Sequence, residues 1–248
     1  MPGRYRFVVT RRWIVGHLVA VLAVIGFVNL GLWQLRRLDE RRAFNATVAA
    51  RTAADPVLLS DLPPLDDGGA ELAWTRVVLE GRYRLNEEVL LQAQSLSGVS
   101  GHDVLTPLDV GGTVVVVDRG WVPIDVAGPP VAGAEPADVI TNVEGVLRTT
   151  EVRGRFGPTD PATGTLERIS RVDLARLDSQ IDGPLFPMWV QLTGSQPAAG
   201  DLPRPRPLPQ LDDGPHLSYA VQWFLFAGVV VVGYPLLLRR TARPAGRG

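Results

Sequence analysis

The sequence contains neither cysteine nor lysine among its 248 residues. Without cysteine there is no disulfide scaffold, no thiolate metal site, no haem attached through cysteine and no cysteine nucleophile. All 25 basic residues are arginine, and histidine occurs only three times. The sequence also lacks a P-loop, a zinc-protease motif, a glycine-rich dinucleotide fingerprint and a nucleophile elbow. We therefore expect a protein that is not an enzyme.

Acidic residues are missing from both ends of the chain. Residues 1–35 and 216–248 carry four arginines each and no acid, whereas the 17 arginines and 26 acids between them give a net charge of −9. Each end also contains a long run without formal charge, residues 13–35 and 216–238. Because about 20 helical residues cross a bilayer core, we predict two transmembrane helices. A cleaved signal peptide is disfavoured, since arginines follow the first run instead of a small-residue cleavage site.

The arginines predict the orientation of the two spans. The C-terminal tail, residues 239–248, is basic, whereas acidic residues precede the second span. The positive side of a span stays in the cytoplasm, so we place this tail there. Two spans put both ends on one side, which makes residues 1–12 a second cytoplasmic tail. The region between the spans, residues 36–215, is then extracytoplasmic.

The extracytoplasmic region reads as a mainly β domain after a helical extension of the first span over residues 36–53. Residues 55–69 are rich in proline and glycine and read as a loop. A proline-rich segment, residues 203–215, predicts a stiff, extended linker to the second span. We expect an antiparallel barrel or sandwich with one short helix over 173–180, capped by Asp173. The predicted strands are 75–83, 88–94, 103–108, 113–117, 138–147, 166–172 and 188–192.

Two polar motifs in this domain invite a functional interpretation. Residues 98–103 bring a serine, a histidine and an aspartate together, but catalytic triads assemble in space, and a polar hairpin loop is the better interpretation. The run 114–117 ends in Asp118, Arg119, Gly120 and Trp121. Arg119 could face a ligand or partner; alternatively, it pairs with an acid at a structural corner whose core Trp121 fills.

The start of the second span gathers residues that suit a haem. On a helix, His216, Tyr219 and Trp223 share one face. Imidazole ligates haem iron, aromatic rings stack on porphyrins, and arginine forks bind propionate carboxylates. The end of the first span supplies the remaining candidates at the same depth, which are Trp33, Gln34, Arg36 and Arg37.

A simpler interpretation remains open for this set. Tryptophan and tyrosine concentrate at membrane interfaces for physical reasons, and arginine meets lipid phosphate there. His17 lies near the cytoplasmic end of the first span, about 20–25 Å of membrane depth from His216 at 1.5 Å per residue. The two histidines therefore do not hold one iron in a monomer, and His17 reads as a packed or snorkelling side chain.

Three blocks of the sequence resemble the surfeit-locus cytochrome oxidase assembly factors, called Shy in yeast. They are LGLWQLRRLDERRAFNA after the first span, VVVVDRGWVP with the upstream GHDVLTPL, and GPHLSYAVQWFLFA at the second span. The opening RYRFVVTRRWIVGHL is similar to the actinobacterial branch. The resemblance covers nearly the whole chain and implies a bacterial plasma-membrane protein.

The resemblance implies help in assembling haem-a-containing cytochrome c oxidase by acting on its catalytic subunit. Membrane lipid is the other expected contact, and no nucleic acid is expected. In bacterial relatives a histidine at the second span is implicated in binding haem a, and that position maps onto His216, the candidate iron ligand. The other blocks map onto Trp33, Gln34, Arg119, Gly120 and Trp121. The alternative is a haem-free structural partner or scaffold of the oxidase or of the respiratory supercomplex.

Overall fold

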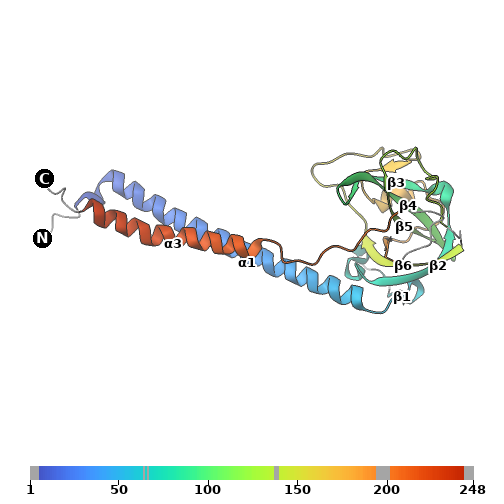
Figure 1. The fold of residues 1–248 in the computed structure, drawn as a ribbon, viewed down its shortest axis with the longest axis horizontal. Coiled ribbons are helices and arrows are strands. Elements are labelled where there is room, and N and C mark those ends of the chain that lie inside the picture. The colour runs from blue at the N-terminus through green and yellow to red at the C-terminus, as the bar shows by residue number, and fades with distance from the viewer. Residues whose placement is uncertain (1–5, 64, 66, 137–139, 194–201, 243–248) are drawn as a thin grey trace. The chain divides into compact units, whose positions relative to one another are not determined.

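The computed structural model describes residues 6–63, 65, 67–136, 140–193 and 202–242. The chain divides into two compact units. Unit 1 comprises Met1–Thr47 and Leu211–Gly248, and unit 2 comprises Val48–Gln210. Figure 1 labels the two long helices of the first unit, α1 and α3, and the strands β1 to β6 of the second.

Unit 1 is built from two long helices that run side by side (Figure 1). A short 3-10 helix, η1 (Arg6–Val9), precedes α1 (Arg11–Ala53), and α3 spans His216–Thr241. α1 continues beyond unit 1, which confirms the predicted helical extension of the first apolar run. Both helices are long and apolar enough to cross a membrane, and most of their large apolar side chains are exposed. These features support a membrane protein with two spans.

A glycine and several aromatic rings bring α1 and α3 together. A Cβ atom at Gly31 would lie 2.6 Å from the ring of Phe224, so the ring occupies space that only glycine leaves free. One helical turn along α1, the rings of Phe27 and Trp223 stack with their centroids 5.8 Å apart. Close backbone approach at small residues is the usual way in which membrane helices associate.

Polar side chains also join the two helices. The hydroxyl of Tyr234 lies 2.8 Å from Nδ1 of His17, and Nε2 of His17 lies 3.1 Å from the carbonyl oxygen of Val8. Both ring nitrogens of His17 are therefore engaged within unit 1. This arrangement agrees with the interpretation of His17 as a packed histidine.

Unit 2 is a mainly antiparallel β-barrel with one short α-helix. Asp173 caps that helix by accepting a hydrogen bond from the backbone nitrogen of Arg176, as the sequence predicts. In chain order the elements are β1 (Val57–Leu58), η2 (Leu59–Asp61), η3 (Asp67–Leu72), β2 (Arg76–Tyr83), η4 (Leu85–Glu87), β3 (Val89–Leu96), β4 (Val99–Val110), β5 (Thr113–Pro123), β6 (Ile140–Thr149), β7 (Arg168–Ile169), α2 (Leu174–Asp178) and β8 (Met188–Leu192).

Five strands close the barrel in the order β2-β6-β8-β5-β4, and β4 returns to β2 at the pair Tyr83↔Leu108. Strand direction reverses at every antiparallel pair, so a ring of five strands cannot be antiparallel throughout. The required parallel pair joins β5 to β8 at Val117↔Val190, whereas the other four pairs of the ring are antiparallel. Outside the ring, β3 pairs with β4, β7 with β3, and β1 with β2.

β5 is buried on both faces. Val115 and Val117 belong to a core to which all five ring strands contribute. Val114 and Val116 belong to a second core, which also includes Leu174 and Leu177 of α2. A strand covered on both sides has no polar face, and this explains the unbroken valine run in the sequence.

The predicted strands are present, with shifted bounds. The expected strand 188–192 coincides with β8, whereas the expected strand 166–172 shortens to the two residues of β7. Residues 138 and 139 of the expected strand 138–147 lie outside the described residues. The predicted loop over 55–69 contains β1 and two 3-10 helices, which the proline and glycine pattern did not reveal.

The prediction of a polar hairpin loop over 98–103 is confirmed only at Gly98 and is wrong for residues 99–103. The turn is made by Ser97 and Gly98, with φ of 52° and 81°, and the following residues belong to β4. His102 and Asp103 are buried there, with 7% and 2% of their surfaces exposed. Asp103 finds its partner, Arg206, elsewhere in unit 2, which the local sequence does not show.

Candidate functional site

The candidate site of unit 1 is centred on His216, the first residue of α3. Nδ1 of its ring lies 2.9 Å from Oε1 of Gln34 on α1. The preceding Gly214 adopts a positive φ of 64°, which places the chain in the left-handed region that glycine tolerates. The histidine thus begins the second span with one ring nitrogen bound to the first span.

A cavity of about 340 Å³ lies beside this histidine. Arg37, Arg41 and Phe44 line it, and their spacing puts them on one face of α1. Glu40 completes the lining and forms an ion pair with Arg37 at 2.7 Å. The cavity therefore combines an imidazole, an aromatic ring, two guanidinium groups and the carboxylate that pairs with one of them.

Hydrogen bonds hold the turn before α3 against α1. The carbonyl oxygen of Asp212 accepts from Nδ2 of Asn45 at 2.8 Å and from Nε of Arg41 at 3.1 Å. Nε of Arg42 donates to the carboxylate of Asp213 at 2.9 Å. This turn fixes the start of α3 and therefore the position of His216.

The structure brings only part of the predicted set together. His216 and Arg37 line the cavity, and Gln34 binds the histidine ring. Tyr219 and Trp33 are about half exposed on the helices, and Trp223 stacks on Phe27 farther along α3. Arg36 is exposed.

Arg41 and Phe44 were not predicted as site residues. The helical extension of α1 carries the signal that could have found them, because positions 37, 41 and 44 repeat at helical spacing. Along α1, the members of the cavity were predicted only as far as Arg37. The site extends two turns beyond it.

Arg119 belongs to unit 2, where it pairs with a buried acid, as the structural alternative for this residue predicts. Its guanidinium lies 3.3 Å from Oε2 of Glu88, and both side chains are at most 3% exposed. Glu88 also accepts hydrogen bonds from the hydroxyl of Thr106 and the backbone nitrogen of Val131. Burial nevertheless raises the pKa of the Glu88 carboxyl above its ordinary value. The Arg119 guanidinium donates further to the carbonyl oxygen of Ala134.

Gly120 and Trp121 hold the chain segment that leaves the barrel, which we call the exit segment (residues 202–210). A Cβ atom at Gly120 would overlap the carbonyl oxygen of Arg204, and the φ of Gly120 is 121°. Trp121 and Arg204 exchange two backbone hydrogen bonds of 2.8 Å. The Trp121 side chain is buried and covers Gly101, where a Cβ atom would meet the indole.

The carboxylate of Asp103 fixes Arg206, which lies two residues beyond Arg204 in the exit segment. Nε of Arg206 lies 2.5 Å from Oδ2 of Asp103. Asp118, which is fully enclosed, accepts a hydrogen bond from the backbone nitrogen of Gly120 at 2.9 Å. Burial and the neighbouring Asp103 raise the pKa of Asp118 to about 8, so this carboxyl is largely protonated at neutral pH. The predicted linker is therefore bound to the barrel over Arg204 and Arg206.

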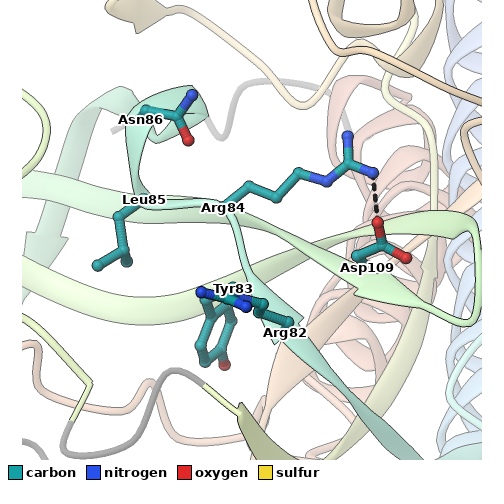
Figure 2. Close-up of a pocket in the computed structure, with 6 residues that line it drawn as sticks. All are labelled: Arg82, Tyr83, Arg84, Leu85, Asn86 and Asp109. Atoms are coloured by element: carbon teal, nitrogen blue, oxygen red, sulfur yellow. Dashed lines mark hydrogen bonds and ion pairs between the residues drawn. The ribbon is translucent and has the colours of Figure 1, made fainter.

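A second cavity, of about 440 Å³, lies in unit 2 at the seam between β2 and β4. Arg84 dominates it, and Figure 2 shows this side chain directed at Asp109. The two form an ion pair at 2.5 Å that lowers the pKa of the Asp109 carboxyl. A second nitrogen of Arg84 donates to the carbonyl oxygen of Asp182. Arg84 is thus bound internally, and none of the residues that line this cavity is a histidine, so this cavity is the weaker candidate.

Comparison with known proteins agrees with this layout. The model of the SURF1 family matches residues 21–228. An uncharacterized SURF1-like protein of Mycobacterium tuberculosis is 30% identical over 242 residues, which cover 94% of this chain and 85% of the relative. The cytochrome oxidase assembly protein SHY1 of Saccharomyces cerevisiae is 28% identical over 120 residues, which cover 47% of this chain and 30% of the relative. With a family match over most of its length, the chain belongs to the SURF1 family.

Proposed function

We propose that this chain is an assembly factor for haem-a-containing cytochrome c oxidase that holds haem a beside His216 for the catalytic subunit. The name of the yeast relative supports a role in oxidase assembly. The sequence supports the orientation, because the basic tail after α3 favours cytoplasmic termini and an outward-facing unit 2. The proposed holding site then lies at the outer side of the membrane.

One observation carries the proposal: the contact of His216 with Gln34 engages Nδ1 and leaves Nε2 for a ligand. Metal-ligating histidines commonly bind a second group through their other nitrogen in this way. Haem needs one such protein ligand, so a set with a single histidine fits. Among the described residues no group of three or more histidine and acidic side chains could hold a bare metal ion.

The charges around His216 suit the rest of haem a. Its propionates are carboxylates, which Arg37 and Arg41 can bind through their guanidinium groups. Its tail is apolar, and the exposed apolar surface of α1 and α3 continues directly from the site. A protein that passes its haem on must also release it, and one histidine binds less tightly than a pair. We therefore expect transient binding of moderate affinity.

Arg119 has no part in the proposed site. Its guanidinium is buried and is bound to Glu88 and Ala134 within unit 2. Breaking that ion pair to bind a propionate would leave a buried carboxylate without its partner.

The test is haem absorbance of the purified full-length chain from membranes of a haem-a-producing host. We expect a Soret band in the wild type, a strong loss in His216→Ala and retention in His17→Ala. His17 is the matched control, because it is the other histidine of unit 1 and binds Tyr234 instead. No haem in any of these proteins, with oxidase subunits still co-purifying, would contradict haem holding and leave a haem-free structural partner of the oxidase.

A further inference from the structure

We infer that Gln34 is a positioning residue that holds the His216 ring with a proton on Nδ1 and an open lone pair on Nε2. This inference rests on the proposed function, because it assigns the iron-facing nitrogen of the same site. It adds a residue on the first span that never touches the iron and acts only through the imidazole.

The hydrogen bond itself determines the tautomer. Oε1 of the Gln34 amide is an acceptor only, so the 2.9 Å contact requires Nδ1 to donate. A neutral imidazole carries a single N–H, and its other nitrogen is then an acceptor. With the proton held on Nδ1, the lone pair of His216 is on Nε2. Free histidine has no such constraint.

Gly214 keeps the opposite edge of the ring uncovered. A Cβ atom at this position would contact Cδ2 of His216 at 3.5 Å and Nε2 at 3.6 Å. The positive φ of Gly214 also disfavours any other residue. Gln34 thus binds Nδ1, and Nε2 lies beside a residue that has no side chain. Gln34 and Gly214 therefore both leave Nε2 accessible.

The scaffold around Gln34 is independent of the ring. Asn45 and Arg41 hold the carbonyl oxygen of Asp212, so the turn before α3 stays bound to α1 without the glutamine. Gln34 is therefore not needed to attach α3 to α1. Its contact with His216 orients the imidazole, and this distinguishes it from the structural hydrogen bond of Asn45.

Two variants of Gln34 and one control test this assignment. Gln34→Leu removes the acceptor, and Gln34→Glu replaces it with a stronger one. Asn45→Leu removes a hydrogen bond of 2.8 Å between the same two segments without touching the ring. A merely structural role would make Gln34→Leu and Asn45→Leu behave alike.

The first measurement needs no haem. Nitrogen-15 NMR of the full-length chain with labelled histidine reports the tautomer of each imidazole at pH 8, and His216→Ala identifies the signals of His216. We expect the Nδ1–H tautomer in the wild type, Gln34→Glu and Asn45→Leu, and a shift toward Nε2–H in Gln34→Leu. An Nε2–H tautomer in the wild type would overturn the inference whether or not haem binds.

The second measurement is haem affinity and the iron–histidine stretching frequency of the reduced, haem-loaded protein. Outer hydrogen-bond partners of metal ligands typically contribute about 10–100-fold in affinity, so we expect a loss of that order in Gln34→Leu. The frequency should fall in Gln34→Leu, rise in Gln34→Glu and stay constant in Asn45→Leu. Unchanged frequency and affinity in both Gln34 variants would overturn the inference while haem holding stands. Haem that remains bound in His216→Ala, or is absent throughout, would overturn the proposed function, with the NMR tautomer still deciding how Gln34 orients the ring.

Discussion

Trp121 and Arg204 exchange both of their backbone hydrogen bonds, although they belong to segments far apart in the chain. The close approach depends on Gly120, whose missing side chain makes room for the carbonyl group of Arg204. Gly120 and Trp121 therefore hold the exit segment, which leads to the second span. Arg119, the third residue of this corner, has a separate structural role in the ion pair with Glu88.

Replacing Gly120 should release the exit segment. Gly120→Ala introduces a Cβ at a φ of 121° and displaces Arg204, so we expect a loss on the order of 2–4 kcal/mol from backbone strain and two hydrogen bonds. Hydrogen–deuterium exchange of the full-length chain should show faster exchange at the amides of Trp121 and Arg204. Gly112→Ala is the matched control, because φ is also positive there and a Cβ would meet open space. Equal exchange in the two variants would refute a specific role of Gly120.

The buried carboxyl of Asp118 should make unit 2 less stable as the pH rises. Its pKa is about 8 in the folded chain and about 4 when unfolded, so between these values the folded state keeps a proton that the unfolded state has lost. The free energy of unfolding consequently falls across this window. Burial also raises the pKa of Asp103 and of Glu88, which adds to the same slope.

Asp118→Asn should flatten that slope, since the amide oxygen still accepts from the nitrogen of Gly120. We expect a gain of about 1–3 kcal/mol at pH 9, the typical desolvation penalty that the neutral side chain avoids. Thermal unfolding of the solubilised chain between pH 5 and 9 measures it, with the exposed Asp125→Asn as control. Parallel wild-type and Asp118→Asn curves would assign the titration to another group.

Removing Arg119 should affect stability and leave haem binding intact. Arg119→Leu leaves the carboxylate of Glu88 buried without its cation, and such losses cost about 3–5 kcal/mol. The double variant with Glu88→Gln should recover part of this loss, because the amide needs no cation. Unfolding measurements on the two single variants and the double variant give the interaction energy. A normal melting temperature with lost haem would instead favour a direct contact of Arg119 with the ligand.

Replacing Gly31 should weaken the packing between the two spans. Gly31→Ala places a methyl group 2.6 Å from the Phe224 ring, and overpacking of this kind costs about 1–3 kcal/mol. Adding Phe224→Leu should restore the pairing, whereas Gly26→Ala should have little effect because nothing lies within 4 Å of its Cβ. The chain has no cysteine, so spin labels at Val19→Cys and Val232→Cys report the separation of the helices. Unchanged distances in Gly31→Ala would contradict tight packing there.

Hydropathy and local patterns were sufficient for the elements that form from neighbouring residues. The two apolar runs became helices, Asp173 caps α2, and the expected strand 188–192 is β8. Valines 114–117 also signalled a buried strand, because such a run has no face for solvent.

Contacts between distant segments could not be predicted. No residue near Asp103 in the sequence indicates that Arg206 is its partner. The segment that ends at Asp103 was therefore predicted as a polar loop, although Asp103 lies in a buried strand. The pairing of β5 with β8 depends on closure of the ring, which no local pattern encodes. At the candidate site, the set predicted on α1 ended at Arg37, and Arg41 and Phe44 were missed although they continue the helical repeat.

The position of β8 in the ring has a consequence for biogenesis. This strand is the last of the ring to be synthesised, and it pairs with β5 and β6, which are the two edges of the sheet β6-β2-β4-β5 that the earlier strands form. A nascent chain that has emerged only as far as β6 has a gap where β8 belongs, and its valine-rich strand lacks one neighbour. The barrel is therefore completed only after the chain up to Leu192 has left the ribosome, shortly before α3 follows.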